Sequence, residues 1–265
     1  MGNLSYQEKM TGVIFGFLRT IMELHERFKP ADIVFCWDSP KSWRKVIFPD
    51  YKGNRNKDLS PTERRDRETA YSQFNELRDD ILPRIGFANV FTQTGIEADD
   101  IIAKVVIEQP LGELFYRKHI IVSSDNDLFQ VLALADMYFI DKKQLFTKKD
   151  FIEQYDVHPS DWLKVKSLVG DSSDNIPGVK GVGIKTAVKY LNGNRTMKLT
   201  QLIQENADQI NLNEILMRIP HSRTESVEVK QSKINMFQFE QVCMENGFNF
   251  FMKKEQYFKW EKMFQ

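Results

Sequence analysis

The sequence predicts an α/β fold in its first part, with a parallel sheet flanked by helices, and an all-helical second part. Continuous apolar runs at 32–37 and 119–123 are typical of strands that are buried on both faces of a parallel sheet. Amphipathic helical patterns lie between these runs, and from Phe151 onward the pattern is helical throughout. We therefore place a domain boundary near Val157 and expect domains at 1–157 and 158–265.

Local signals set the expected elements of the first domain. Apolar residues recur every three or four positions from Met10 to Phe28, which predicts a helix that ends before Pro30. A capping box with proline at the first helical position, Ser60 to Glu63, predicts the start of a second helix that ends near Pro83. We expect this helix to turn four side chains inward: Tyr71, Phe74, Leu77 and Ile81. Further strands are predicted at 87–91 and 137–140, and a hairpin over 141–146.

Composition excludes several classes of protein. Lysine plus arginine and aspartate plus glutamate are both 37, so net charge gives no sign of a nucleic-acid partner. No apolar run approaches membrane-spanning length, so we expect no membrane partner. Cys36 and Cys243 cannot form a disulfide framework, which favours free thiols in a reducing cytoplasm. The four histidines lack metal-ligand spacing, which argues against zinc.

Basic residues are concentrated in two segments. Residues 41–67 hold nine Lys or Arg against four Asp or Glu, and residues 178–198 hold five against none. In the first segment Trp43 and Tyr51 alternate with cations, as in sites where bases stack on aromatic rings and cations hold phosphates. A solvated surface loop is the alternative interpretation of this segment.

The stretch 167–190 combines acids and glycines. Asp171 and Asp174 lie three residues apart in a short polar turn, an arrangement that suits a hard cation such as Mg²⁺. The following residues, 178–186, form a glycine-spaced hairpin that opens a helix and offers backbone N–H groups to a phosphate. The alternative is a glycine-rich loop between two helices, with both acids at helix ends.

Other acids follow predicted strands or begin helices. If the sheet is doubly wound, its strand ends bring six acids to one edge, and the second domain supplies two more. The eight residues are Asp38, Glu97, Asp99, Asp100, Asp125, Asp127, Asp171 and Asp174. Two carboxylates ~5 Å apart repel by roughly 3 kcal/mol at an effective dielectric constant of ~20, so such a site needs cations. Two divalent ions could activate water and stabilise an in-line displacement at phosphorus.

Five motifs in order carry a family resemblance: WDS, YKGNR, GIEADD, SSDNDLFQ and GDSSDNIPGVKGVGIKTA. Over roughly residues 10 to 192 the chain resembles the 5′ nuclease family, which includes flap endonucleases, bacteriophage 5′→3′ exonucleases and the nuclease domain of bacterial family A DNA polymerases. The resemblance implies a PIN-like parallel sheet with flanking helices, plus a helical region whose helix–three-turn–helix binds duplex DNA.

The resemblance also implies roles for individual residues. Asp38, Glu97, Asp99 and Asp100 would hold or support one Mg²⁺, and Asp125, Asp127, Asp171 and Asp174 a second, with Mn²⁺ as a substitute. Lys52 and Arg55 would steer the scissile phosphate and stabilise its developing charge. The turn from Gly178 to Thr186 would bind the duplex backbone, with K⁺ on its carbonyls. The residues expected to contact DNA are Trp43, Arg44, Lys45, Tyr51, Gly178, Lys180, Gly181, Gly183, Lys185 and Thr186.

One departure from the family pattern concerns the first strand. Family members begin with an apolar strand that ends in a metal-binding aspartate, whereas here Met1-Gly2-Asn3-Leu4 directly precedes the first predicted helix. Three outcomes are open: the strands at 33–37 and 119–123 pair directly, a separate polypeptide supplies the strand, or the sequence is truncated. We favour truncation, and expect the chain alone to be less stable and less active than a version with the strand.

The leading functional hypothesis is a metal-dependent 5′ nuclease that removes flaps or RNA primers during replication, in the cytoplasm of a bacterium or a phage-infected host. Its partners would be 5′-flap, branched or nicked DNA, RNA–DNA hybrids and other replication proteins. The rival hypothesis is a catalytically impaired DNA-junction-binding homologue that lacks the first aspartate. A PIN-like ribonuclease without junction specificity is a third, which the glycine hairpin disfavours.

Overall fold

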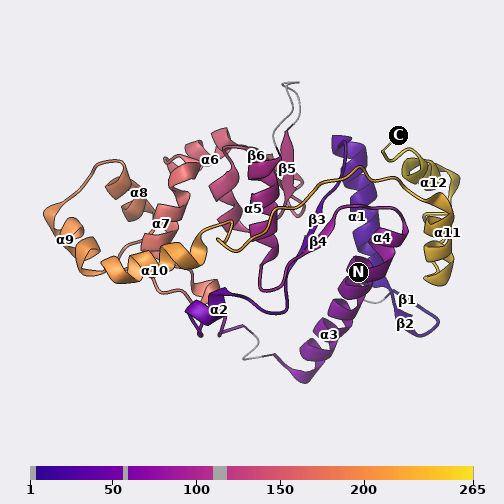
Figure 1. The fold of residues 1–265 in the computed structure, drawn as a ribbon, viewed down its shortest axis with the longest axis horizontal. Coiled ribbons are helices and arrows are strands. Elements are labelled where there is room, and N and C mark those ends of the chain that lie inside the picture. The colour runs from indigo at the N-terminus through magenta and orange to yellow at the C-terminus, as the bar shows by residue number, and fades with distance from the viewer. Residues whose placement is uncertain (1–3, 56–58, 110–117, 265) are drawn as a thin grey trace. The chain divides into compact units, whose positions relative to one another are not determined.

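The computed structural model describes residues 4–55, 59–109 and 118–264 (Figure 1). The chain forms two compact units, each built from segments that are distant in sequence. The terminal unit comprises Met1–Trp37, Asp58–Phe91 and Glu228–Gln265, and the central unit comprises Asp38–Lys57 and Thr92–Val227. The position proposed for a domain boundary, Val157, lies inside the central unit.

The terminal unit is mostly helical. A short antiparallel hairpin precedes the first long helix, and strands β3 and β4 pair in a two-stranded sheet. Its elements are β1 (Ser5–Tyr6), β2 (Lys9–Met10), α1 (Gly12–Phe28), β3 (Phe35–Trp37), α3 (Pro61–Glu76), the π-helical η1 (Leu77–Ile81), α4 (Leu82–Arg84), β4 (Val90–Thr92), α11 (Met236–Glu245) and α12 (Lys254–Glu261). The predicted first helix is confirmed in α1.

The second predicted helix begins as expected but continues past its predicted end. Ser60 accepts a hydrogen bond from the Glu63 backbone N–H, and Glu63 accepts one from Ser60, so the capping box is present. The helical path runs through Pro83 to Arg84. The inward direction of Tyr71 is wrong, since this side chain is 52% exposed. Phe74 near the end of α3 packs against the core, and Leu77 and Ile81 of η1 lie within it, as expected.

The core of the terminal unit joins both ends of the chain. Ile14 and Leu18 of α1 pack in one cluster with Phe239 of α11 and Trp260 of α12. The segment before α11 is hydrogen-bonded along residues 85–89, for example from the Asn235 N–H to the Ile85 carbonyl at 2.9 Å. The last helices therefore complete a core that the first helix begins.

The central unit holds a three-stranded mixed sheet and most of the helices. Strand β5 (His119–Val122) pairs in parallel with β6 (Ala135–Phe139), and β6 pairs antiparallel with β7 (Gln144–Phe146). The helices are α2 (Arg44–Ile47), α5 (Ala98–Glu108), α6 (Lys148–Tyr155), α7 (Trp162–Val169), α8 (Ile184–Leu191), α9 (Met197–Glu205) and α10 (Ala207–Met217), with 3₁₀ turns η2 (Asn126–Val131), η3 (Pro159–Asp161) and η4 (Ser172–Asp174).

The predicted parallel pairing is present between β5 and β6, and the described strands lie in short ladders. Strands β3 and β4 form one sheet and β5 to β7 another, so β3 and β5 are not hydrogen-bonded neighbours. The region around each strand is nevertheless α/β in character, with helices packed on the short sheets. No helix among the described residues is long and apolar enough to cross a membrane.

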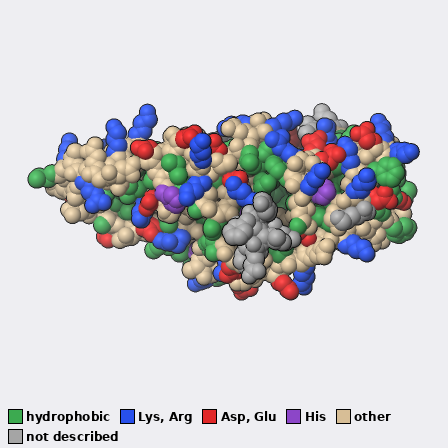
Figure 2. Space-filling view, turned by 90° about the horizontal axis from the view of Figure 1, so that it is seen from above, with side chains coloured by type: hydrophobic (Ala, Val, Ile, Leu, Met, Phe, Trp, Pro, Cys, Tyr) green, Lys and Arg blue, Asp and Glu red, His purple; other side chains and the backbone are tan. Residues whose placement is uncertain are grey.

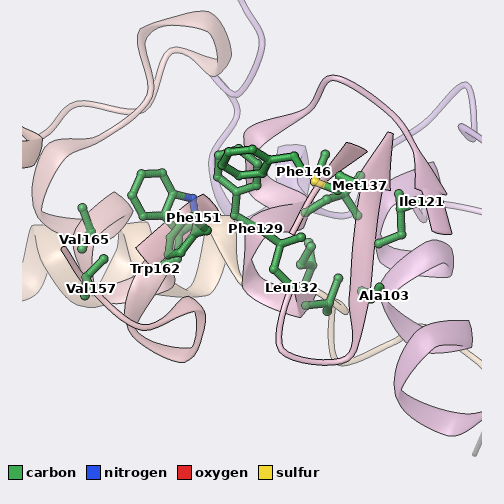
Figure 3. Close-up of a cluster of buried hydrophobic side chains, with 14 of the residues drawn as sticks. Ala103, Ile121, Phe129, Leu132, Met137, Phe146, Phe151, Val157, Trp162 and Val165 are labelled. Carbon is green, nitrogen blue, oxygen red and sulfur yellow. The ribbon is translucent and has the colours of Figure 1, made fainter. Parts of the chain in front are cut away.

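An aromatic core positions two of the chemically important segments of the central unit. Phe129 of η2 packs against Phe146 and Phe151, and Trp162 of α7 packs against the same group (Figure 3). The indole N–H of Trp162 donates to the Asn126 carbonyl at 2.9 Å. The acidic loop at the start of η2 is thereby fixed relative to α7.

Gly178 is required by packing, and its replacement by alanine is expected to destabilise the central unit. A Cβ at this position would lie 1.8 Å from the Val169 carbonyl oxygen, so backbone must move. We expect a loss of at least about 1–3 kcal/mol, the usual cost of overpacking, visible as a lower melting temperature. Gly183→Ala is the matched control, because a Cβ there has no neighbour within 4 Å. Equal melting temperatures for the two variants would contradict this role.

Candidate functional site

The site is assembled from two loops that are joined by hydrogen bonds. One follows α2 and carries Lys52 and Arg55; the other is η4 with its N-cap, Asp171, and its last residue, Asp174. The Lys52 N–H donates to the Asp174 carbonyl at 2.8 Å, and the Asn54 and Asn175 amides donate across the same seam to the Ser172 and Asp50 carbonyls at 2.7 and 2.9 Å. Lys52 has a φ of 54°, a strained value for a non-glycine residue that the seam stabilises.

The basic side chains of the first loop are paired with acids. Nζ of Lys52 lies 2.8 Å from Oε2 of Glu97, and Nη2 of Arg55 lies 2.6 Å from Oδ1 of Asp174. The Tyr51 hydroxyl lies between the same two acids, 2.9 Å from Glu97 and 3.0 Å from Asp174. Burial acts to raise the pKa of Glu97, but the charges of Lys52 and Arg44 outweigh it and the pKa is lowered. Glu97 is therefore a carboxylate at neutral pH.

A second group of acids has few cationic neighbours. Burial, followed by the charges of Asp125, Asp38 and Asp127, raises the pKa of Asp99 well above its usual value. Burial also raises the pKa of Asp127, to about 6. Among the described residues Asp38, Asp99 and Asp125 form no ion pair with a basic side chain. Negative charge is thus concentrated here and is compensated only in part.

Lys166 of α7 is a site residue that the sequence analysis missed. Its Nζ lies 2.5 Å from Oδ2 of Asp171 and 3.1 Å from Oδ1 of Asp127, and its side chain is 12% exposed. The sequence contained a signal: Lys166 is four residues after Trp162 and three before Val169, which places a charge on the inward face of an amphipathic helix. A cation on an apolar face indicates a buried acidic partner.

Two residues expected to contact DNA lie inside the protein instead. Arg44 is 3% exposed, and its guanidinium forms a two-point ion pair with Asp100, at 2.5 and 2.8 Å. Tyr51 is 2% exposed and packs in a small cluster with Leu163 and Ile176. Trp43 is half-buried, with the Arg223 guanidinium 4.0 Å above its ring. Lys45 remains exposed.

The acids and bases line one small cavity of about 20 Å³, enough for a water-sized guest. Six of the eight expected acids lie on or beside it, whereas Asp38 and Asp171 are outside its lining. The lining residues are Arg44, Tyr51, Lys52, Glu97, Asp99, Asp100, Asp125, Asp127, Asp174, Ile176, Leu216, Met217 and Ile219. In the part of the chain that the structure describes, no three of the acids converge closely enough to hold a metal ion as they stand.

The glycine hairpin has an open side. Lys180 and Lys185 are exposed, and neither Gly181 nor Gly183 has an atom within 4 Å of the position of a Cβ. Gly181 has a φ of 84°, which favours glycine. Gly183 is the N-cap residue of α8. Because glycine has no side chain, it provides no side-chain acceptor for the first backbone N–H groups of the helix. Thr186 follows in the first turn of α8 and is half-buried. Over the face in Figure 2, Lys and Arg side chains are interspersed with acids and do not form one large patch.

Comparison with known proteins identifies the relatives of this chain. Residues 3–156 match the family model described as 5′-3′ exonuclease, N-terminal resolvase-like domain, and residues 157–240 match 5′-3′ exonuclease, C-terminal SAM fold. The chain is 35% identical to the 5′-3′ exonuclease of Bacillus subtilis over 189 residues, which cover 68% of this chain and 58% of that protein. It is also 35% identical to DNA polymerase I of Streptococcus pneumoniae over 187 residues, 68% of this chain and 20% of that protein.

Solved structures share the fold at low sequence identity. The bacteriophage T5 D15 protein, co-crystallised with metal ions, has a TM-score of 0.67 and 23% identity, covering 77% of this chain and 80% of that chain. Flap endonuclease-1 from Methanococcus jannaschii has a TM-score of 0.63 and 16% identity, covering 98% and 84%. The resemblance inferred from the five motifs is confirmed, and the chain belongs to the 5′-3′ exonuclease family.

Proposed function

We propose that this chain acts as a metal-dependent, structure-specific 5′ nuclease that hydrolyses phosphodiesters of branched DNA or of RNA primers during replication, in the cytoplasm. The observation that carries the proposal is the joined pair of loops, which places Lys52 and Arg55 beside an acidic cavity. The alignment covers 58% of the length of the Bacillus subtilis relative. The activity is therefore proposed from the residues of this chain and is not transferred from the relative.

Divalent metal fits the donor set of this cavity. Its ligands would be carboxylate oxygens, which suit Mg²⁺ or Mn²⁺, and among the described residues Asp38, Asp99 and Asp125 form no ion pair with a basic side chain. We propose that Asp99, Asp125 and Asp127, with Glu97 and Asp38, hold or support the ions, and that Asp171 and Asp174 support the second of two. When bound, such ions activate water and stabilise charge on the phosphate oxygens. The related T5 5′-exonuclease binds divalent metal ions in its solved structure, which supports this proposal.

The protein's own cations would orient the phosphate. Lys52 and Arg55 are held by the seam to η4, so their charges are positioned before substrate arrives, which is the condition for effective transition-state stabilisation. Lys166 would orient Asp127 and Asp171. The exposed hairpin at 178–186 would bind duplex phosphates through Lys180, Lys185 and backbone amides, with K⁺ on its carbonyls.

A flap substrate tests the function. Purified protein is incubated with a 5′-labelled flap duplex, a nicked duplex and single-stranded DNA of the same sequence, with Mg²⁺, with Mn²⁺ or with chelator. Cleavage near the junction that depends on metal and exceeds cleavage of the single strand supports the proposal. Tight junction binding without cleavage in either metal would instead support the rival hypothesis, an impaired DNA-junction-binding homologue.

We also propose that the outer edge of β5 accepts one more strand, from this or another polypeptide. Strand β5 pairs only with β6 in the described structure, which leaves one row of backbone groups without a strand partner. Adding a strand that ends in aspartate is expected to raise both the melting temperature and the rate of flap cleavage in Mg²⁺. The same strand ending in asparagine is the control, which should raise stability alone. Equal stability and activity with and without the strand would reject this proposal.

A further inference from the structure

The buried ion pair between Arg44 and Asp100 has more partners than the two side chains alone. Nε of Arg44 donates to the Leu216 carbonyl at 2.6 Å, and Nη2 donates to the Arg218 carbonyl at 3.1 Å. Oδ1 of Asp100 accepts the His221 backbone N–H at 2.7 Å, and Asp100 is 0% exposed. Together the two side chains therefore bind the end of α10 and the backbone that follows it.

That backbone forms a wall of the acidic cavity. Leu216, Met217 and Ile219 line the cavity, and the Gln130 side chain binds the Met217 carbonyl at 2.9 Å and the Ile219 N–H at 3.4 Å. The segment 216–221, which we call the wall segment, is thus held by side chains from α2, η2 and α5. Lys52 lies in the loop after α2, Asp127 lies in η2 and Asp99 in α5, so the relative positions of these three residues are coupled through the wall segment.

The ion pair also reaches Glu97. Glu97 and Asp100 are the N-cap and third residues of α5 and form a reciprocal cap, in which Oδ2 of Asp100 accepts the Glu97 N–H at 3.4 Å. Nη1 of Arg44 lies 3.7 Å from Oε2 of Glu97, the oxygen that also faces Lys52. A shift of Arg44 would therefore move both the wall segment and the carboxylate that orients Lys52.

We propose that Arg44 and Asp100 are positioning residues that clamp the wall segment to the start of α5, and that Asp100 is not a metal ligand. This proposal rests on the nuclease function above and deepens it by separating Asp100 from the ligand acids. Both oxygens of Asp100 already accept hydrogen bonds, from a guanidinium and two backbone amides, and the residue borders the cavity but is 0% exposed to solvent. Removing the charge of one partner leaves the other charge buried and unpaired, which lowers the free energy of unfolding.

The test compares Arg44→Lys and Asp100→Asn with two reference variants. Asp136→Asn removes a buried carboxylate in β6 that pairs with Lys118, in the same unit but outside the cavity, and controls for general destabilisation. Asp99→Asn is the reference for a proposed ligand. Four quantities are measured on each full-length variant: melting temperature, Mn²⁺ affinity by calorimetry without DNA, amide hydrogen exchange over 216–221, and the single-turnover rate on flap DNA.

The clamp predicts one pattern for both variants. Exchange over 216–221 accelerates by about tenfold or more, because the groups that hold the wall segment are lost. Mn²⁺ affinity stays near that of the wild type, and the single-turnover rate falls by about 100-fold, the usual cost of a small misplacement in an active site. Arg44→Lys keeps the charge but cannot reach all its partners at once, so its rate should fall without loss of fold.

Three results would overturn the proposal. Loss of Mn²⁺ affinity in Asp100→Asn equal to that in Asp99→Asn would make Asp100 a ligand. Unchanged amide exchange over 216–221 would show that the ion pair does not hold the wall segment. If the cleavage rate fell no more than in an equally destabilised Asp136→Asn variant, the pair would contribute only to the stability of the fold. If the wild type does not cleave flap DNA, the proposed nuclease function is rejected. The clamp is still tested in that case, by amide exchange over 216–221 and by Mn²⁺ affinity.

Discussion

Replacing Lys52 by alanine is expected to slow single-turnover cleavage of flap DNA by about two to three orders of magnitude, the cost of removing one preorganised charge that stabilises a transition state. Nζ of Lys52 lies in the acidic cavity, 2.8 Å from Glu97, and its backbone is fixed to Asp174. Affinity for the flap should change little, since most phosphate contacts would be made elsewhere. The measurement is the rate at saturating enzyme, with the dissociation constant determined separately.

Lys180→Ala and Lys185→Ala are the matched controls for this prediction. Both lysines are exposed on the open side of the hairpin, away from the cavity lining. Each should weaken duplex binding and reduce the slope of log affinity against log salt by about 0.9, while the single-turnover rate at saturation is retained. If Lys52→Ala altered only affinity, or if the hairpin variants altered the chemical step, the assigned roles would be reversed.

Features that depend on local pattern could be predicted from the sequence. The helix at 12–28, the capping box at Ser60 and the strand at 119–122 all follow from residues within one or two turns of each other. The gathering of Asp99, Asp125 and Asp127 at one cavity also follows, because acids after strands and at helix starts share an edge in α/β folds. In each case the signal and the structure lie in the same short segment.

The partners of buried charges could not be predicted in this way. Arg44 lies in a run of cations that looked like a DNA-binding loop, but its partners are Asp100 and the carbonyls of 216 and 218, which are far away in sequence. Tyr51 appeared suited to stacking on a base, yet its ring is buried and its hydroxyl faces two acids. The sequence shows that a charged or aromatic side chain is present. Whether that side chain is buried depends on packing against segments that are distant in sequence.

The packing of distant segments within the terminal unit also could not be predicted from the sequence. Nothing local indicates that 228–235 lies along 85–89, or that Trp260 packs with α1. Similarly, the glycine hairpin predicts a DNA contact for Gly178, and the structure adds a packing requirement that the sequence does not show, because a Cβ there would meet the Val169 carbonyl oxygen. Close approach of backbone to backbone leaves no periodic pattern, because the partner segment is held by the fold as a whole.

Replacing Asp127 by asparagine is expected to abolish most cleavage while DNA affinity stays equal or rises. Asp127 lies in the first turn of η2, in the acidic group with Asp99 and Asp125, so its loss removes a proposed metal ligand and also a negative charge near the substrate phosphate. Removing a residue that hydrogen-bonds a metal ligand lowers metal affinity or activity by about 10- to 100-fold. Removing a ligand itself should therefore lower the cleavage rate by more than about 100-fold. Rate in saturating Mg²⁺ and affinity by anisotropy are measured in parallel, with Asp136→Asn as the control for loss of a buried carboxylate outside the cavity. Turnover equal to the wild type at saturating Mg²⁺ would remove Asp127 from the metal site, and reduced affinity would show that its charge does not face the phosphate.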